Sequence, residues 1–202
     1  MSLTEKVPAE GYPAQGKEIP QGVKSVYIPE KIIQDKVKQM AEAAAVSLPQ
    51  RIHSLIILKG ASVFAADFFR ELARIRAFEI YHSFLKVSSY GKNAESSGEV
   101  VLSHDIHEVR DRTILVIEDI IDTGRTLVRL RDYLIRERGA QQVSFCCLLD
   151  KKSARLPYVK LVPDFCGFEV ENLFLVGYGL DYAEKFRELP YIGVLDRTAF
   201  GV

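Results

Sequence analysis

Residues Thr113–Glu118 form an almost continuous run of β-branched and apolar side chains, TILVIE, and this run limits the folds that are open to the chain. A strand that is apolar on both sides is buried on both faces, which is typical of a parallel sheet covered by helices. Leucines then recur at helical spacing over 127–134, Gly139 marks the end of that helix, and Val143–Leu149 indicates the next strand. The order strand, helix, strand predicts an α/β fold with a twisted, mainly parallel sheet flanked by helices.

The same periodicity predicts further elements on both sides of this unit. A helix is expected over 29–46, with Pro29 in its first turn, and a strand, a turn and a second helix are expected over 52–75. Further extended segments are expected over 78–87, 99–102, 164–170, 174–180 and 192–195. The polar stretch Ser88–Gly98 is longer than an ordinary hairpin loop, which favours a lid or a binding loop.

Composition suggests one globular domain preceded by an arm. Nearly half of the 202 residues are hydrophobic, 48%, and 27% are charged, which is the profile of a chain with a proper core. Prolines and glycines alternate through residues 8–22 with few apolar neighbours. We therefore expect an extended or disordered arm over 1–22 and a single folded domain over 23–202.

Charge and hydropathy exclude several classes of function. The chain carries 27 Lys plus Arg and 27 Asp plus Glu, so no overall field attracts nucleic acid or an anionic membrane. No apolar run approaches the roughly 18 to 20 residues that cross a bilayer, and the first residues lack the apolar stretch of a signal peptide. We expect a cytoplasmic protein. Its cysteines, Cys146, Cys147 and Cys166, form no CxxC pair and are expected to be reduced, buried thiols.

The segment that follows the buried strand, Asp122–Thr126, has the composition of a phosphate-binding loop. It offers a glycine that lets the backbone curl, two hydroxyls and the backbone N–H groups of a helix start. Ligands of parallel α/β sheets bind at the carboxyl ends of the strands, where this segment is expected. The pattern GxxxxGK[ST] is absent, and the run at 177–182 fails GxGxxG at its last position, so triphosphate and dinucleotide sites lose support.

Two acids, Glu118 and Asp119, end the expected strand immediately before this loop. Carboxylates beside a phosphate site call for hydroxyls or a metal ion, and vicinal sugar hydroxyls donate well to carboxylates. The combination predicts a site for a phosphorylated ribose. By itself, the sequence TGRT could equally be a capped helix start, and the acid pair after a buried strand argues against that alternative.

The stretch VIEDIIDTGRT resembles the phosphoribosyl diphosphate motif of type I phosphoribosyltransferases, in the form found in their hypoxanthine-guanine branch. Other stretches are similar to that family as well: Leu58-Lys59-Gly60 to its pyrophosphate loop, Ser89-Tyr90-Gly91 to its mobile lid, and PDFCGFEV, FLVGYGLDY and FREL to its C-terminal base pocket. The resemblance runs from about Val26 to Leu195. It implies the type I phosphoribosyltransferase fold, in which a small hood formed by the N-terminal segment and the C-terminal strands covers the sheet.

The resemblance implies a reaction in which a purine nitrogen displaces pyrophosphate from C1 of the ribose, with Mg²⁺ as cofactor. It assigns Asp122 as the catalytic acid-base group, although Asp122 could also cap the next helix. The remaining implied site residues are Glu118 and Asp119 for the ribose hydroxyls; Thr123, Gly124, Arg125 and Thr126 for the 5-phosphate; Lys59, Gly60 and Arg187 for pyrophosphate; Ser89 and Tyr90 for the lid; Lys151, Phe174, Leu175 and Asp181 for the base; and Asp181 for the metal.

Each of these residue types also has a plainer interpretation. Lys59 and Arg187 could be surface residues, Asp181 could cap a turn, and an aromatic such as Phe174 inside an apolar strand is most often part of the core. Lys151 bears on specificity, because an ammonium group donates to O6 of a 6-oxopurine and has nothing to accept it in adenine. The resemblance further implies a cis peptide bond between Leu58 and Lys59.

The expected function is therefore purine salvage, with hypoxanthine and guanine as bases and a homodimer or homotetramer as the assembly. Two alternatives stay open: a xanthine-preferring phosphoribosyltransferase, since Lys151 does not decide what lies at purine C2, and a non-catalytic regulator on the same fold. His104 and His107 lie in a polar connector without a third ligand nearby, so a metal site there is not expected. Lys152 and Leu175 depart from the commonest residues of the family.

Overall fold

The computed structural model describes residues 3–12, 19–86 and 109–201. In these ranges the α-helices are α1 (Glu30–Ser47), α2 (Ala61–Ile75) and α3 (Arg125–Arg136). The strands are β1 (Glu5–Lys6), β2 (Val23–Ile28), β3 (Arg51–Leu58), β4 (Glu79–Lys86), β5 (Thr113–Ile121), β6 (Gln142–Asp150), β7 (Phe165–Glu169), β8 (Leu175–Val176) and β9 (Ile192–Leu195). Short 3₁₀ turns follow β6 and β9, at Lys152–Ala154 and Arg197–Phe200.

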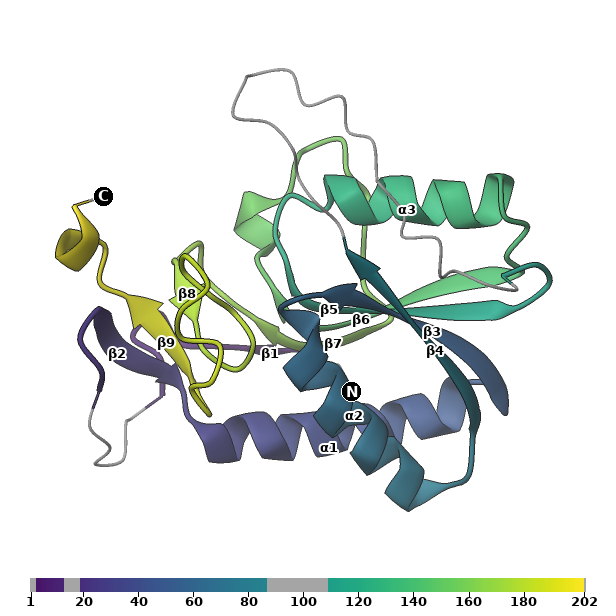
Figure 1. Cartoon of the computed structure of the whole chain (residues 1–202), viewed down its shortest axis with the longest axis horizontal. Coiled ribbons are helices and arrows are strands. Elements are labelled where there is room, and N and C mark those ends of the chain that lie inside the picture. Colours follow the sequence, from purple (N-terminus) through teal and green to yellow (C-terminus); the bar gives the residue numbers. More distant parts are fainter. Residues whose placement is uncertain (1–2, 13–18, 87–108, 202) are drawn as a thin grey trace.

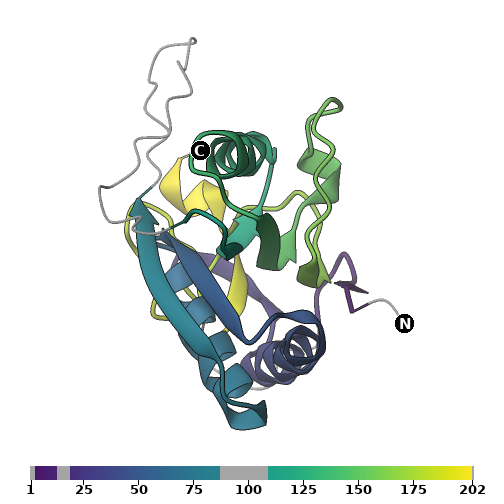
Figure 2. The same cartoon turned by 90° about the vertical axis from the view of Figure 1, so that its right-hand side faces the viewer.

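The main sheet has six strands in the order β1-β7-β6-β5-β3-β4, and every neighbouring pair is parallel. Helices α1 and α2 cover one face of this sheet and α3 covers the other (Figures 1 and 2). The expected α/β fold with a mainly parallel sheet between helices is confirmed. All strand ends that lead into helices lie at one edge of the sheet, so this edge gathers the loops.

Strand β5 lies near the centre of the sheet and is buried on both faces. Ile114 and Val116 pack in the cluster that contains the leucines of α3, whereas Leu115 and Ile117 pack in the cluster under α1 and α2. Burying each such side chain contributes roughly 1.5 to 3 kcal/mol. The alternation explains why the sequence of β5 shows no polar face.

Strand β5 runs through Ile121, three residues beyond the expected end at Glu118. Glu118, Ile120 and Ile121 are in register with Cys147, Leu149 and Asp150 of β6. The backbone ladder with β6 continues past the polar side chains because strand pairing uses main-chain groups. The two acids therefore lie within the strand rather than at its end.

A second sheet, which we call the hood, has the order β2-β9-β8 with antiparallel pairs. It has its own small core, which includes Val26, Val176, Tyr191 and Leu195. The hood joins the N-terminal strand β2 to the C-terminal strands β8 and β9, and it lies beside the main sheet (Figure 1). Tyr178 ties the hood to α2 by donating its hydroxyl to Asp67 Oδ2 at 2.6 Å.

The expected strand over 174–180 is wrong beyond Val176. Gly177, Tyr178 and Gly179 all have positive φ, so the chain folds into a turn closed by a bridge between Gly177 and Leu180. Two glycines in this stretch supply the left-handed backbone that a strand does not use. The apolar character of the segment comes from its burial in the hood, not from extended structure.

The N-terminal residues contact the main sheet before β2 begins. Glu5 and Lys6 pair with β7 in parallel, and Val7 is buried. Lys36 of α1 is also buried and forms an ion pair with Glu5, Nζ to Oε2, at 2.8 Å. A two-residue strand is too short to produce a period in the sequence, so no sequence pattern indicated this contact.

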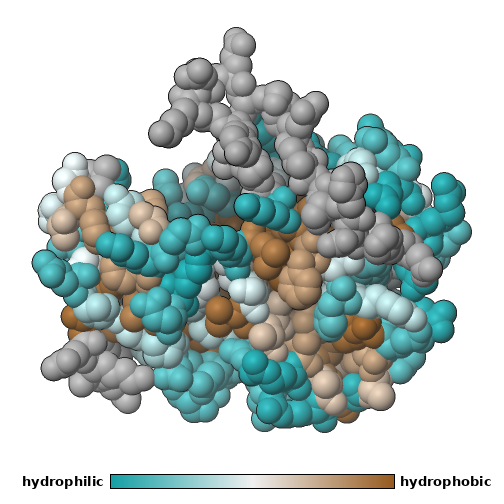
Figure 3. Space-filling model, in the orientation of Figure 1, coloured by the Kyte–Doolittle hydropathy of each residue, from teal (hydrophilic) through white to brown (hydrophobic). Residues whose placement is uncertain are grey.

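The surface and the cysteines can be compared with what the composition led us to expect. Hydrophilic residues cover much of the face in Figure 3, and hydrophobic residues show near its centre and in smaller places toward both sides. The helices in the described ranges include none with the length and apolar character of a membrane span. Cys146, Cys147 and Cys166 are free and buried, as expected.

Candidate functional site

Residues Asp122–Thr126, which we call the phosphate loop, connect β5 to α3 at the carboxyl edge of the main sheet. Gly124 precedes the helix with φ of 75°, a left-handed conformation that glycine adopts without strain. Its carbonyl accepts the first helical bond, from Val128 N at 3.2 Å. The N–H groups of the first helical turn therefore face the loop, an arrangement that favours an anion.

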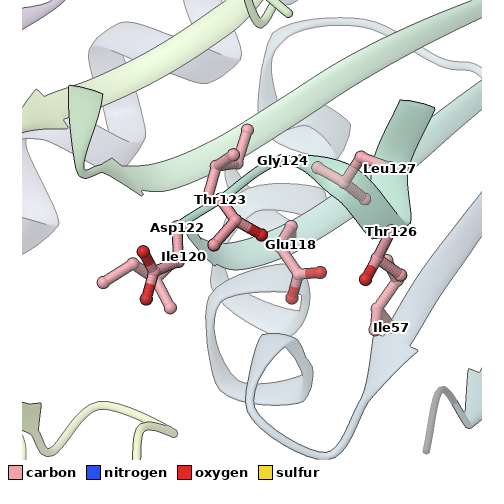
Figure 4. Close-up of a pocket in the computed structure, with 9 residues that line it drawn as sticks. Ile57, Glu118, Ile120, Asp122, Thr123, Gly124, Thr126 and Leu127 are labelled. Atoms are coloured by element: carbon pink, nitrogen blue, oxygen red, sulfur yellow. The ribbon is translucent and has the colours of Figure 1, made fainter. Parts of the chain in front are cut away.

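A cavity of about 240 Å³ opens beside this loop. Its lining residues come from the ends of β3 and β5 and from the start of α3: Ile57, Glu118, Ile120, Ile121, Asp122, Thr123, Gly124, Thr126 and Leu127. The Glu118 carboxylate and the Thr123 and Thr126 hydroxyls face one common space (Figure 4). The cavity therefore combines hydrogen-bond donors for a phosphate with an acceptor for hydroxyls.

The Asp122 side chain points away from that space, on the other side of the loop (Figure 4). There its charge acts on Lys151, the residue that follows β6. Burial lowers the pKa of Lys151, and the Asp122 carboxylate partly offsets that shift. The Lys151 backbone N–H donates to the Ile121 carbonyl at 2.9 Å, which holds the two strand ends together. The Asp122 carboxylate and the Lys151 ammonium group are thus close enough for their charges to interact.

Glu118 and Asp119 lie side by side and are only partly exposed. Burial raises the pKa of both carboxyls, and the charge of Asp119 raises the pKa of Glu118 further. The Ile120 N–H donates to Asp119 Oδ1 at 2.8 Å, and the Asp119 N–H donates to Glu118 Oε1 at 3.2 Å. Two desolvated acids with raised pKa values lower their energy when hydroxyls or a cation approach them.

Gly60 lies directly against the Asp119 carboxylate. A Cβ placed on Gly60 would lie 1.6 Å from Asp119 Oδ2, and a Cβ on Gly179 would lie 2.2 Å from the Gly60 carbonyl oxygen. Gly60 follows the Leu58–Lys59 peptide bond, which is cis, as the resemblance implied. The turn after β3, the end of β5 and the hood turn therefore meet at Gly60.

A network of charged side chains connects the hood to the turn after β3. Arg187 Nη2 pairs with Asp181 Oδ1 at 2.8 Å and with Glu184 Oε2 at 3.3 Å, and Glu184 Oε2 also pairs with Lys59 Nζ at 3.0 Å. Arg187 Nη1 donates to the Gly179 carbonyl at 2.7 Å, and its positive charge partly offsets the rise that burial causes in the pKa of Asp119. Lys59, Asp181 and Arg187, predicted from distant parts of the sequence, are thus in one network.

The remaining expected base residues belong to the hood. Leu175 is buried in β8, and Phe174 is 43% exposed. The Phe174 ring meets Tyr182 edge to face, with 5.6 Å between centroids, and the Phe174 carbonyl accepts from Leu195 N at 2.8 Å. These contacts tie Phe174 to the hood rather than to the phosphate loop, and its exposure leaves ring surface for a ligand. The expected lid residues, Ser89 and Tyr90, and both His104 and His107 lie outside the described residues.

Arg155 contacts the site although sequence analysis assigned it no role. Its Nη1 donates to the Asp122 carbonyl at 3.1 Å, and its Nη2 pairs with the buried carboxylate of Asp150. Arg155 stands four residues after Lys151 in the sequence. No spacing rule connects it to a loop 33 residues earlier, so the sequence carried no signal for this contact.

Comparisons with known proteins place these features in a family. Residues 33–183 match the family model described as the phosphoribosyl transferase domain. The hypoxanthine-guanine phosphoribosyltransferase of Bacillus subtilis is 46% identical over 181 residues, covering 88% of this chain and 96% of that protein. The bifunctional protein TilS/HprT of Listeria monocytogenes is 43% identical over 86% of this chain, which spans 26% of that longer protein.

Solved structures extend the likeness to three dimensions. A hypoxanthine phosphoribosyltransferase from Staphylococcus aureus matches with a TM-score of 0.79 and 31% identity, over 89% of this chain and 95% of that one. The hypoxanthine phosphoribosyl transferase of Trypanosoma cruzi matches with a TM-score of 0.82 and 29% identity, over 92% and 97%. The chain therefore belongs to the type I phosphoribosyltransferase family, in the branch of the hypoxanthine-guanine enzymes.

Proposed function

We propose that this protein transfers the 5-phosphoribosyl group from phosphoribosyl diphosphate to hypoxanthine and guanine, giving IMP or GMP and pyrophosphate, and so acts in purine salvage. The observation that carries the proposal is that one edge of the sheet holds the phosphate loop, the Asp122 and Lys151 pair, and the network of Lys59, Asp181 and Arg187. These three groups match the three parts of the reaction: a sugar phosphate, a base and a leaving group.

The sugar phosphate is assigned to the cavity. We assign the 5-phosphate to the backbone and side chains of Thr123, Gly124, Arg125 and Thr126. The N–H groups of the helix start and two hydroxyls supply donors to its oxygens. Glu118 and Asp119 accept from the ribose hydroxyls, which offsets the cost of keeping two carboxylates partly desolvated. The C1 atom is then oriented toward the side of the loop on which Asp122 lies.

The purine is assigned to the space between Lys151 and the hood. Lys151 donates to O6, and Asp122 accepts the proton from N7 while N9 attacks C1 of the ribose. The exposed Phe174 ring stacks on the base, and the backbone of Leu175 and Asp181 faces its edge. Asp122 is close enough to Lys151 for its charge to raise the pKa of Lys151, which supports one base contacting both residues.

The leaving pyrophosphate is assigned to Lys59, Gly60 and Arg187. A guanidinium grips such an anion through two N–H groups, and the turn at Gly60 presents backbone N–H groups. The described residues include no group of three or more His, Cys, Asp and Glu side chains placed to hold a metal ion. Mg²⁺ keeps several waters and takes substrate oxygens, so Asp181 as its protein ligand fits that donor set. Bound Mg²⁺ would neutralise charge that develops on the leaving group.

Two rival functions differ in what they predict for the base. A xanthine-preferring transferase would keep the same phosphate loop and differ only around purine C2. A regulator on this fold would bind the sugar phosphate without turnover, and the presence of Asp122, Lys151, Asp181 and Arg187 argues against it. We also propose that the protein works in the cytoplasm as a homodimer or homotetramer, with small molecules as its substrates.

One assay separates these functions. The full chain is mixed with phosphoribosyl diphosphate and Mg²⁺, and hypoxanthine, guanine, xanthine and adenine are offered separately while nucleotide is measured. We expect hypoxanthine and guanine to react and adenine to be rejected. Asp122→Ala should slow turnover by about 10² to 10⁴, the usual contribution of a positioned acid-base group. Preference for adenine would contradict the role of Lys151, and nucleotide from no base would favour the regulator.

A further inference from the structure

Arg155 contacts the phosphate loop and is not one of the residues that line the cavity. Its side chain is only 11% exposed and makes two contacts: with Asp150 at the end of β6, and with the Asp122 carbonyl at 3.1 Å. Asp150 is buried in full, with 1% of its side chain exposed. One guanidinium therefore joins the last residue of β6 to the first residue of the phosphate loop.

The residues that follow Arg155 continue this contact along the loop. The Leu156 N–H donates to the Thr123 carbonyl at 3.3 Å, and Tyr158 accepts from Arg125 Nη2 at 3.1 Å. Gly124 lies so close to this segment that a Cβ on it would be 2.8 Å from Arg155 Nη1 and 2.9 Å from Val159 Cγ1. Each loop residue from Asp122 to Arg125 thus has a partner in Arg155–Val159.

We infer that Arg155–Val159 form a brace that fixes the phosphate loop, and that Arg155 is a positioning residue for Asp122. The inference rests on the proposed function. The brace begins four residues after Lys151, so it also sets the distance between the proposed base-reading lysine and the proposed acid-base group. Geometry of that kind matters, because a displacement of about 1 Å in a reacting group can cost about 10²-fold in rate.

The side chain chemistry explains why an arginine stands here. The planar guanidinium has five N–H donors in a fixed fork, so it can pair with a carboxylate and still donate to a carbonyl. A lysine ammonium could neutralise Asp150 but cannot reproduce both contacts in one plane. Arg155 therefore has two separable roles: it is the counterion of a buried acid, and it holds the Asp122 backbone.

The two roles are separated by removing the buried charge together with the arginine. Arg155→Met alone leaves Asp150 unpaired and is expected to lower stability strongly. In the double variant Asp150→Asn with Arg155→Met, no buried charge is left unpaired, so thermal stability should recover. Arg155→Lys is the conservative variant. The matched control is Lys36→Met, which removes another buried cation and breaks its ion pair with the exposed Glu5, between α1 and β1.

Three quantities are measured for each variant: the unfolding temperature, kcat/KM for phosphoribosyl diphosphate, and the affinity for ribose 5-phosphate by calorimetry. We expect the double variant to unfold near the wild-type temperature, while kcat/KM stays about 100-fold below wild type and ribose 5-phosphate binds about 10-fold more weakly. For Arg155→Lys, both kcat/KM and the affinity for ribose 5-phosphate should lie between those of wild type and those of the double variant. Lys36→Met should lower the unfolding temperature but change both functional quantities less than twofold.

Several results would overturn the inference. Full recovery of kcat/KM in the double variant would make Arg155 a counterion only, and equal functional losses in Lys36→Met would trace them to general destabilisation. If Arg155→Met does not fold, the double variant and Arg155→Lys still show whether Arg155 positions Asp122 or is only a counterion. If the wild type makes no nucleotide, the proposed function fails, but the ribose 5-phosphate affinities still test the brace. Unchanged affinity in the double variant would then reject it.

Discussion

The two halves of the site differ in how they are assembled. The phosphate loop comes from one contiguous stretch between β5 and α3, and it presents backbone groups, hydroxyls and a glycine. The opposite half takes Lys59 from the turn after β3 and Asp181, Glu184 and Arg187 from the hood. The first half is built by local geometry, whereas the second exists only when the hood and the main sheet are in contact.

The halves also differ in how their charges are balanced. Lys59 and Arg187 already pair with carboxylates of this chain, and Lys59 holds the pKa of Glu184 below its usual range. On the other side, Glu118 and Asp119 have raised pKa values. Under the proposed function, a pyrophosphate would have to replace internal partners of the two cations, whereas a ribose would supply hydrogen-bond donors to two acids whose pKa values are raised.

Gly60 is the residue at which the two halves meet, and among the variants that test how the halves fit together we expect Gly60→Ala to have the largest effect. The added Cβ would collide with Asp119 Oδ2 at 1.6 Å, so the Asp119 carboxylate or the turn must shift. A shift of about 1 Å should lower kcat/KM for phosphoribosyl diphosphate by about 10²-fold. Steady-state kinetics on the purified variant measures this loss.

Gly201→Ala is the control, because nothing lies within 4 Å of the Cβ it adds, and the strain from its positive φ of 68° falls at the end of the Arg197–Phe200 turn, outside the site. It should leave kcat/KM within about twofold of wild type, and circular dichroism should show the same fold in both variants. A Gly60→Ala protein with wild-type kinetics would mean that the two halves can move independently. The idea that the halves are fitted together at Gly60 would then be wrong.

What the sequence predicted follows the same division. The β5 strand and the phosphate loop were predicted because all their information is local: a run of apolar residues, a glycine at a helix start and a helical period after it. The hood turn after Val176 was expected to be a strand, because its residues are apolar, as in a buried strand. Its positive φ angles produce no repeating pattern in the sequence that could have indicated a turn. In this segment the sequence pattern predicts correctly that the residues are buried, but it does not predict the backbone conformation.

Contacts between distant segments left no pattern in the chain. The resemblance to a family assigned Lys59 and Arg187 to the pyrophosphate, yet nothing in their spacing indicated that Glu184 connects them. The approach of Gly60 to Asp119 and the brace at Arg155 are of the same kind, since each joins residues whose separation in sequence is set by whole elements. Tertiary structure alone determines such pairs.

A substitution of Glu118 tests whether the acids beside the phosphate loop lack compensating partners in the absence of ligand. Burial and the neighbouring Asp119 raise its folded pKa above 4.5, so the folded protein holds this proton to a higher pH than the unfolded chain. Stability is therefore lost as pH rises from about 4.5 through the folded pKa. Glu118→Gln should therefore be more stable than wild type at pH 7.5 and about equal to it at pH 4, where folded and unfolded protein differ little in the protonation of Glu118. Urea unfolding at both values measures the gain.

Glu79→Gln is the control of opposite sign, because Arg51 holds the pKa of Glu79 below its usual range. Removing that carboxylate should give no gain at pH 7.5. The Glu118→Gln enzyme should also bind ribose 5-phosphate more weakly, because it loses an acceptor for the sugar hydroxyls. Equal stability of Glu118→Gln and wild type at pH 7.5 would show that Glu118 is well compensated in the absence of ligand.

The smallest expected effect is that of Glu184→Gln, and it is a gain in ligand binding rather than a loss. Glu184→Gln removes the carboxylate that competes with pyrophosphate for Lys59 and Arg187. All of these contacts are near solvent, where ion pairs are weak and screened by salt, so we expect pyrophosphate to bind only two- to threefold more tightly at low salt and equally at high salt. Calorimetry measures the affinity for pyrophosphate. The control is Glu188→Gln, which removes a carboxylate four residues after Glu184 in the sequence. Weaker binding in Glu184→Gln would instead mean that Glu184 orients the two cations, and that this half, like the phosphate loop, is ready before its ligand arrives.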